Sequence, residues 1–260
     1  MRKKIIGQHK GKGMDYRQSH KAPEKGKRYH ELFQNKNFTR IVWEWEQDQL
    51  DSIFTERFDQ QDKIKYLDFA CGTGRIIRFF ENKGNINSAV GVDVSISMIE
   101  EAKKHTKSKI IVADITREKI FPDNNFDFIT AFRFFLNAQE SLKQEAMSAL
   151  AQLLCENGIL VFNIHMQEGS LYDIVAKVYN YFKRQKPTYN TVKLADIYKL
   201  TEINKLEIKT IYHFGLIPLR YEKNISTLYN VLKYIEGMFS KISFLQPVSR
   251  NLIIVCKKKK

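Results

Sequence analysis

The pattern that most constrains the fold of this chain is a regular alternation of short β-rich segments with helical segments over residues 63–164. The β-rich segments are dominated by Ile, Val, Phe and Tyr, and the segments between them carry apolar residues at helical spacing. Parallel strands need a crossover to return the chain, and that crossover is usually a helix. The alternation therefore predicts an α/β fold, with a parallel sheet covered by helices on both faces.

The predicted elements follow one another without a domain linker. The expected strands are 63–69, 88–92, 109–112, 126–132, 159–164, 206–214 and 251–256, and the expected helices are 74–82, 95–104, 139–155, 191–204 and 225–241. Aromatic and apolar residues from Tyr29 to Phe54 indicate one or two further helices that lead into the domain. Ser95 is expected to cap a helix, and Asn157-Gly158 to end one.

Basic residues are concentrated at the two ends of the chain. The whole chain has 43 Lys and Arg against 29 Asp and Glu, a net charge of +14. Residues 1–40 hold twelve basic and three acidic residues, and residues 257–260 are four lysines, so residues 41–256 carry a net charge of +1. A nucleic-acid cleft needs a basic face on the folded domain, so the neutral core does not favour a nucleic-acid partner. The basic ends could still contact RNA or an anionic membrane, or only keep the protein soluble.

The three cysteines lack the spacing of a disulfide framework or a metal site, so we expect no metal. No apolar stretch has the length of a membrane span, and no apolar region follows the basic N-terminus. These observations predict a cytoplasmic protein.

The most informative motif is the segment 66–75, Tyr-Leu-Asp-Phe-Ala-Cys-Gly-Thr-Gly-Arg, where the first expected strand turns into a helix. Glycines at such a turn let the backbone approach a ligand, although a tight turn needs them without a ligand as well. Asp68 precedes the glycines, Asp93 follows the next expected strand, and Asp114 follows the third. Each of the last two could also be an ordinary helix-cap or strand-end carboxylate.

The same motif separates two classes of ligand. A dinucleotide fingerprint would have a third glycine where this chain has Ile77, and a pyrophosphate would be repelled by Asp68. A ligand with an ammonium group, a ribose and an adenine would match Asp68, Asp93 and Asp114 in order. S-adenosylmethionine has these three groups.

Five segments together resemble the successive motifs of class I S-adenosylmethionine-dependent methyltransferases. They read LDFACGTGR, VGVDVSISMIEEAKK, VADI, FPDNNFDFITA and NGILVFNIH, and they cover about residues 60–165. The resemblance implies a Rossmann-like, mostly parallel seven-stranded sheet whose last strand is antiparallel, with helices on both faces and helical lid elements. It also implies S-adenosylmethionine as the cofactor. The cofactor-binding positions that it implies are Asp68, Ala70, Gly72, Gly74, Asp93, Val94, Met98, Asp114, Ile115 and Phe132, with Arg133 as an alternative to Phe132.

The resemblance also divides the chain. Residues 1–28 are expected to form a flexible basic arm, and residues 29–256 a single methyltransferase domain. A cofactor-binding half would span about residues 60–165, an acceptor and lid half about residues 165–245, and residues 257–260 would form a lysine tail. We expect a monomer or a homodimer.

The acceptor side has fewer sequence signals. His165 follows the fifth expected strand and Tyr29 lies on an entry helix, so both are candidate catalytic residues. An exposed loop histidine is an equally good interpretation of His165. Aromatic residues of 165–190 could form an acceptor pocket or simply cover the sheet. These residues are Tyr172, Tyr179, Tyr181, Phe182 and Tyr189.

Three functions remain open at this stage. The chain after the fourth strand reads Ala-Phe-Arg-Phe, without the proline-containing tetrad of methyltransferases that modify base amines or glutamine. A small-molecule, sugar or lipid-linked acceptor, methylated on oxygen or nitrogen, is therefore favoured. An RNA or protein methyltransferase that uses the basic arm, and a non-catalytic protein that binds the cofactor, are the alternatives.

Overall fold

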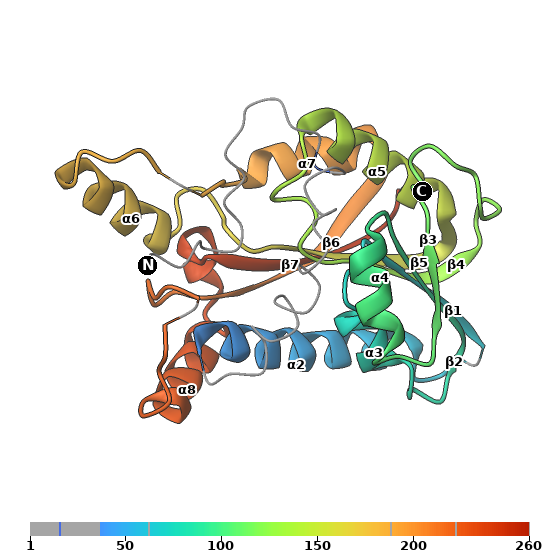
Figure 1. Ribbon diagram of the computed structural model, residues 1–260, viewed down its shortest axis with the longest axis horizontal. Helices are drawn as coiled ribbons and strands as arrows, with labels where there is room; N and C mark the ends of the chain where they lie inside the picture. The colour runs from blue at the N-terminus through green and yellow to red at the C-terminus, as the bar shows by residue number, and fades with distance from the viewer. Residues whose placement is uncertain (1–15, 17–36, 62, 188, 222, 260) are drawn as a thin grey trace.

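The structure, a computed structural model, describes residues 16, 37–61, 63–187, 189–221 and 223–259. The strands are β1 (Ile64–Phe69), β2 (Ile86–Asp93), β3 (Lys109–Val112), β4 (Phe126–Ala131), β5 (Leu154–Ile164), β6 (Leu206–Phe214) and β7 (Asn251–Lys258). They form one sheet in the order β3-β2-β1-β4-β5-β7-β6 (Figure 1), and β7 runs antiparallel to both of its neighbours. The predicted Rossmann-like sheet with an antiparallel last strand is confirmed.

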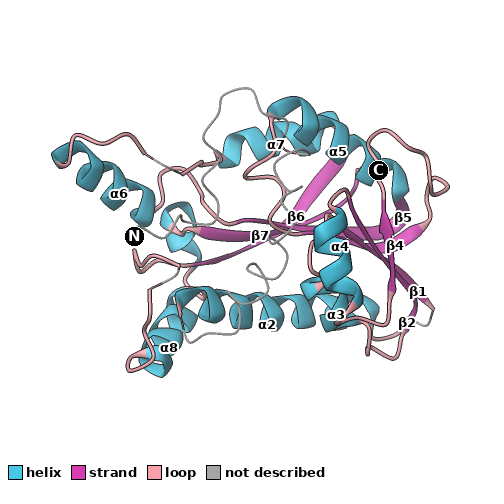
Figure 2. Cartoon of the chain, in the orientation of Figure 1, coloured by secondary structure: helices cyan, strands magenta, loops and turns pink. Residues whose placement is uncertain are grey.

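Helices cover both faces of this sheet (Figure 2). They are α2 (Phe38–Phe58), α3 (Arg75–Phe80), α4 (Ile96–Lys103), α5 (Glu140–Leu153), α6 (Leu171–Phe182), α7 (Leu194–Ile203) and α8 (Tyr229–Phe239), followed by the 3-10 turn η1 (Ser243–Val248). In the view of Figures 1 and 2, α2, α3 and α8 lie below the sheet and α5 and α7 above it, while α6 extends outward at one end.

Each face of the sheet has its own hydrophobic core. The core beneath α2 contains the fully buried Phe38, Phe58 and Phe128, and the core beneath α5 contains Leu150 and Phe162. The two cores use alternate residues of the same strands, because successive side chains of a strand point to opposite faces. Among the described residues, no helix is both long enough and apolar enough to cross a membrane.

Two predicted boundaries differ from the structure. The helix α5 ends at Leu153 and β5 begins at Leu154, so Asn157-Gly158 lies inside a strand and does not end the helix. The pairing with β4 shifts here, since Phe126 pairs with Leu154 and Phe128 with Ile159, which is a bulge-like irregularity. A Cβ at Gly158 would lie 2.9 Å from the carbonyl oxygen of Asp127, so the backbone at this point favours a glycine. The Asn-Gly pair therefore belongs to an irregular strand and not to a helix end.

At the C-terminus, Lys257 and Lys258 pair with Glu207 and Leu206 as residues of β7. The first two residues of the predicted lysine tail are therefore strand residues. The predicted cap of α4 is confirmed, since the Ser95 side chain accepts a hydrogen bond from the backbone N–H of Met98.

The carboxyl ends of β1, β2, β4 and β5 meet at one edge of the sheet, since these strands are parallel and in register. The residue before β7 reaches the same edge, because Leu252 pairs with Ile164 in antiparallel register. The strand pairing therefore brings chain segments that are distant in sequence to one edge, where ligands bind in open α/β sheets.

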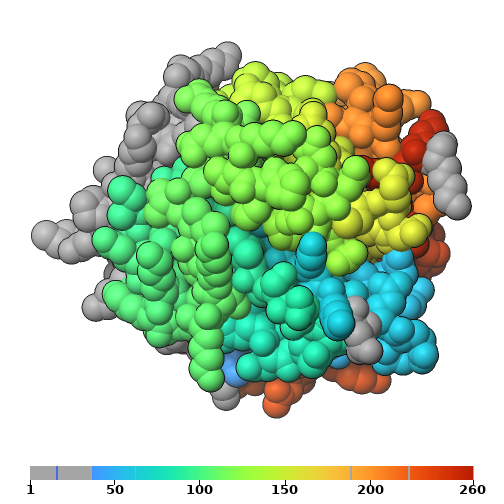
Figure 3. Space-filling view, turned by 90° about the vertical axis from the view of Figure 1, so that its right-hand side faces the viewer, coloured from blue at the N-terminus to red at the C-terminus, as the bar shows by residue number. Residues whose placement is uncertain are grey.

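At the end of the molecule opposite α6, the green segment from α4 through the loop before β4 forms much of the surface (Figure 3).

Candidate active site

The loop between β1 and α3 is held in an unusual backbone conformation. Ala70, Gly72 and Gly74 all have positive φ angles, of 53°, 54° and 76°. A Cβ at Gly74 would lie 3.2 Å from the Cβ of Ala102, so this glycine lets α3 and α4 pack closely. A Cβ at Gly72 would meet no atom within 4 Å. Gly72 therefore borders open space that a ligand can use, whereas Gly74 has a packing role.

Ala70 is held in a strained backbone conformation. Its φ of 53° lies in the left-handed region. That conformation costs an L-residue roughly 1–2 kcal/mol. Strain of this kind at a loop that borders a ligand site is typical of functional sites.

Asp68 is the anchor of this loop. Its side chain is 1% exposed, and it accepts hydrogen bonds from the backbone N–H of Ile77 at 3.1 Å and from the Thr130 hydroxyl at 2.8 Å. Burial raises the pKa of Asp68 to about 7, an effect that these hydrogen bonds and Arg75 oppose. A buried carboxylate with a raised pKa is stabilised by a nearby cation, so this position fits a ligand with an ammonium group.

Asp93 connects the end of β2 to the same loop. One carboxylate oxygen accepts a hydrogen bond from Gly72 N–H at 2.9 Å, and the other accepts one from Ser95 N–H at 2.8 Å. These two bonds hold the Asp93 carboxylate at the carboxyl end of β2, against the loop that follows β1. The structure thus brings Asp93 directly to Gly72, while its role toward a ribose stays a prediction.

Asp114 shapes a turn beyond β3. It accepts hydrogen bonds from the hydroxyl and the backbone N–H of Thr116, at 2.6 and 3.1 Å, and it lies 3.9 Å from the Arg117 guanidinium. Its neighbour Ile115 is buried in the core beneath α5. The ordinary role of Asp114 as a turn-forming carboxylate is therefore realised, and a role toward adenine stays a prediction.

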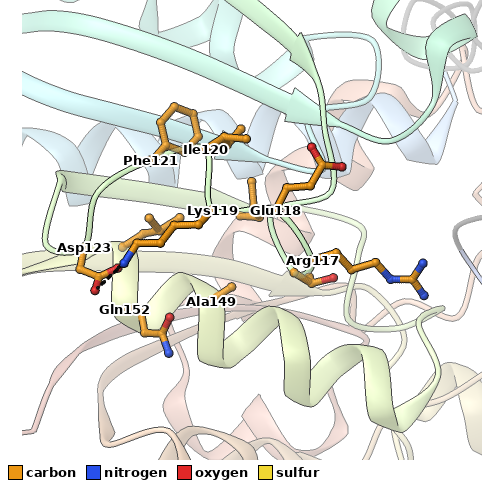
Figure 4. A pocket seen from close by; sticks show the side chains of 11 residues that line it. Arg117, Glu118, Lys119, Ile120, Phe121, Asp123, Ala149 and Gln152 are labelled. Carbon is orange, nitrogen blue, oxygen red and sulfur yellow. Dashed lines mark hydrogen bonds and ion pairs between the residues drawn. The ribbon is translucent and has the colours of Figure 1, made fainter.

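A shallow hollow lies between this turn and α5 (Figure 4). Its wall includes Arg117, Glu118, Lys119 and Asp123, of which Lys119 and Asp123 form an ion pair at 3.2 Å. Of the predicted site residues, Ile115 alone lines it. This hollow is therefore separate from the site formed by the loop after β1.

Three further predicted cofactor positions differ in exposure. Val94 is half-buried beside Asp93, and Met98 is buried in the first turns of α4. Phe132 is 5% exposed and packs in the core beneath α2. The next residue, Arg133, contacts Glu46, and its charge acts on His165.

Near the ends of β4 and β5, a buried carboxylate from α2 forms ion pairs with two arginines. Glu46, which is 1% exposed, contacts Arg75 at 3.0 Å and Arg133 at 3.2 Å. Asn163 donates a hydrogen bond to Glu46 at 2.8 Å and accepts one from the Arg133 backbone N–H at 2.7 Å. Arg133 itself has a φ of 64°. This cluster joins α2, α3, β4 and β5 at the site.

His165 lies where β5 ends, as predicted. Its backbone carbonyl accepts a hydrogen bond from the Tyr221 hydroxyl at 2.7 Å, while its Nδ1 is buried without a hydrogen-bond partner. Burial, together with the positive charges of Arg133, Arg250 and Arg75, lowers the pKa of His165 well below its usual value. The imidazole is therefore neutral at physiological pH, which is the form that can accept a proton.

Arg250, which directly precedes β7, is the third arginine whose charge acts on His165. Its guanidinium lies between two aromatic rings, 3.7 Å from the centre of Tyr172 and 3.6 Å from that of Tyr221. It donates a hydrogen bond to the carbonyl of Leu219 at 2.7 Å. The Arg250 side chain is almost fully buried.

The remaining acceptor-side predictions have different outcomes. Tyr29 lies outside the described residues. Tyr172 contacts Tyr189 edge-on, but Tyr179, Tyr181 and Phe182 are exposed on α6, so only the first pair lies near Arg250. Among the described residues, no group of three His, Cys, Asp or Glu is arranged to hold a metal ion.

Sequence reasoning missed the two residues that organise the basic side, Glu46 and Arg250. Glu46 lies on the apolar face of α2, one turn from the buried Val42 and Leu50. Arg250 directly precedes a strand of continuous apolar residues. A charge on a buried face is a recognisable signal, because burying it requires a partner, but the sequence does not reveal which partner.

The comparisons with known proteins agree with this geometry. Residues 67–162 match the family model described as a methyltransferase domain. An uncharacterized protein of Methanocaldococcus jannaschii is 28% identical over 194 residues, which are 72% of this chain and 66%, just under two thirds, of that protein. A ubiquinone biosynthesis O-methyltransferase of Histophilus somni is 25% identical over 176 residues, 62% of this chain and 72% of the relative.

Solved structures show the same fold. A SAM-dependent methyltransferase of Thermotoga maritima, described as a possible histamine N-methyltransferase, has a TM-score of 0.59 at 16% identity. The superposition covers 90% of this chain and 95% of that one. The fold predicted from the five sequence motifs is therefore confirmed, and residues 67–162 match the methyltransferase domain that those motifs indicate.

Proposed function

We propose that this chain, a member of the class I S-adenosylmethionine-dependent methyltransferases, transfers a methyl group to an oxygen or nitrogen atom of a small-molecule, sugar or lipid-linked acceptor. The observation that carries the proposal is the meeting of two chemically different groups of residues at one sheet edge. The carboxylates Asp68 and Asp93 hold the loop at Gly72, and His165 lies at the end of the neighbouring β5.

The residues of the first group fit the cofactor. Asp68 places a buried carboxylate near the loop, Asp93 lies at the end of β2 against Gly72, where a carboxylate could accept ribose hydroxyls, and the backbone at Gly72 borders open space. When bound, S-adenosylmethionine supplies an electrophilic methyl group. Val94, Met98 and Ile115 would contribute apolar contacts beside the carboxylates, and a role for Phe132 would come through the core that supports the loop.

The second group would position and deprotonate the acceptor. The neutral imidazole of His165 can take a proton from an acceptor hydroxyl or ammonium as the acceptor atom attacks. The main task of the remaining residues is to hold the acceptor in line with the methyl group, because orientation supplies much of the rate enhancement of such displacements. The O-methyltransferase name of the Histophilus somni relative favours oxygen as the acceptor atom.

The test is transfer of a tritium-labelled methyl group from S-adenosylmethionine into three separate pools: a small-molecule extract, total RNA and total protein. We expect label in the small-molecule pool, and we expect His165→Gln to slow transfer by about 10²-fold or more. The same variant should bind S-adenosylhomocysteine as tightly as the unchanged protein. Label confined to RNA or protein would contradict the proposed acceptor class, and absence of S-adenosylhomocysteine binding would contradict the activity itself.

The alternative with a polymer acceptor depends on the basic residues near the N-terminus. Tyr16 contacts the site side of the domain, since its backbone N–H donates to Gln139 at 3.1 Å and its ring meets Phe134 edge-on. A truncation through Tyr16 would remove this contact together with the charge. Replacing Lys3, Lys4, Lys10 and Lys12 with glutamine leaves Tyr16 in place. A large, salt-dependent loss of turnover in that variant would favour RNA or protein, and unchanged turnover would favour the small acceptor. A cytoplasmic location and a monomeric or homodimeric state stay predictions.

A further inference from the structure

Arg250 is a buried cation that forms no ion pair with a carboxylate among the described residues. Its side chain is 2% exposed and contacts two aromatic rings and one backbone carbonyl. Its Nε is buried and makes no hydrogen bond. Within the described part of the chain, no carboxylate lies within ion-pair distance of Arg250. A buried charge without a partner is costly, so such a group is normally kept for a ligand or a reaction.

The surroundings of Arg250 carry an excess of positive charge. Arg75 and Arg133 both contact the carboxylate of Glu46. On α6, the buried Asp173 is paired with Lys177 and accepts a hydrogen bond from Tyr189. Burial and the positive charges of Arg133, Arg250 and Arg75 lower the pKa of His165, so the arginines dominate the electrostatic field at this histidine.

A second buried polar atom without a partner lies beside Arg250. The strand register places residue 250 opposite residue 166, at the carboxyl edge of the sheet, and the Gln167 N–H donates to the Arg250 carbonyl at 3.0 Å. The Nδ1 of His165, one residue before that position, makes no hydrogen bond. Tyr221 links the two residues, because it stacks on Arg250 and donates to the carbonyl of His165.

The aromatic sandwich restricts how Arg250 can bind. Tyr172 and Tyr221 cover both faces of the guanidinium plane, so only its edge of N–H groups is available. An arginine edge is matched by the oxygens of a carboxylate or phosphate. We propose that the methyl acceptor carries such an oxyanion and that Arg250, flanked by Arg133 and His165, binds it. This inference rests on the proposed function and names the acceptor class of the same site.

The test uses the full chain saturated with S-adenosylhomocysteine and follows binding of defined anions by calorimetry. The probes are benzoate, phenyl phosphate and inorganic phosphate, with benzyl alcohol as the neutral control. We expect at least one anion to bind and benzyl alcohol not to bind. Binding by benzoate alone would assign a carboxylate, and binding by the two phosphates alone would assign a phosphate.

Two arginine variants locate the site. Arg250→Gln should weaken the bound anion at least tenfold while S-adenosylhomocysteine affinity stays unchanged, and Arg78→Gln, an exposed arginine on α3, should leave both unchanged. Should Arg250→Gln fail to fold, the inference can still be tested on the unchanged protein through the pKa of His165. An anion beside His165 raises the pKa of its ring, which nuclear magnetic resonance of labelled histidine measures.

The outcomes separate this inference from the proposed function. If S-adenosylhomocysteine binds but no anion does, or if a folded Arg250→Gln binds the anion as well as the unchanged protein, the inference is overturned and the proposed function stands. If S-adenosylhomocysteine itself does not bind, the proposed function is contradicted, and the inference that rests on it falls with it.

Discussion

The two halves of the ligand-binding sheet edge carry opposite charge. Over β1 and β2 the candidate functional side chains are the carboxylates Asp68 and Asp93, whereas over β4, β5 and β7 the candidates are Arg133, His165 and Arg250. The acidic half comes from one continuous stretch of chain, and the basic half is assembled from α2, α3 and three separated strands. A cofactor shared by a whole family can be bound by a local motif, while recognition of a particular acceptor is built from distant residues.

The largest effect is expected from a substitution of Glu46, the carboxylate that contacts both Arg75 and Arg133 in the basic half. Glu46→Ala leaves Arg75 and Arg133 buried without their shared partner, so the free energy of unfolding should fall by about 3–5 kcal/mol. Glu44→Ala on the same helix removes a more exposed ion pair with Arg40 and Lys233 and should cost less than about 1 kcal/mol. Urea unfolding of both variants measures the difference. Equal losses would mean that the two arginines do not depend on Glu46.

A variant of the acidic half should lose ligand binding rather than stability. Asp93→Ala removes the bonds to Gly72 and Ser95 as well as those expected to ribose, and we expect S-adenosylhomocysteine affinity to fall by about 1–3 kcal/mol, roughly five- to 150-fold. Calorimetry measures this, with Asp123→Ala as an exposed control. Unaltered affinity in Asp93→Ala would remove this residue from the cofactor site.

A third prediction uses the titration of Asp68. Its pKa of about 7 in the folded protein is raised above the ordinary value of 3.8, so its contribution to stability is present below about pH 4 and is lost as pH rises to 7. Binding of a cationic ligand needs the ionised form. S-adenosylhomocysteine affinity should therefore be about tenfold lower at pH 6 than at pH 8, since about one tenth of Asp68 is ionised at pH 6.

The control for this titration is Asp68→Asn, which keeps the size of the side chain and cannot ionise. Its affinity should be low and nearly constant across the same range. A slope equal to that of the unchanged protein would assign the pH dependence to another group.

The smallest expected effect concerns the backbone strain at Ala70. Ala70→Gly relieves the left-handed backbone at φ 53° but adds freedom to the unfolded chain, so we expect a gain of about 0.5–1 kcal/mol in unfolding free energy. Thermal unfolding checks it. A loss of stability would show that the Ala70 methyl group contributes more packing than the strain costs.

The sequence was sufficient for the acidic half and for most of the fold. The parallel sheet, the Ser95 cap and the loop carboxylates follow from local spacing, whereas the seven strands and the antiparallel last strand were implied by the family resemblance. It was misleading where one local pattern has two structural meanings, as at Asn157-Gly158, where the pair belongs to an irregular strand. It was insufficient for Glu46 and Arg250, because their roles depend on which strands become neighbours. His165 was found from its place after β5, but its neutral state depends on three arginines from elsewhere in the chain.

Glu46 is a contact shared by the two proposed ligand sites. It contacts Arg75, in the first turn of the helix that follows the proposed cofactor loop, and Arg133, beside the proposed acceptor-side histidine. A ligand that draws Arg133 toward itself would change the contact between Glu46 and Arg75, and the reverse would hold as well. If both proposed ligands act on these arginines, we expect each ligand to change the affinity of the other by the same factor, because linkage is reciprocal.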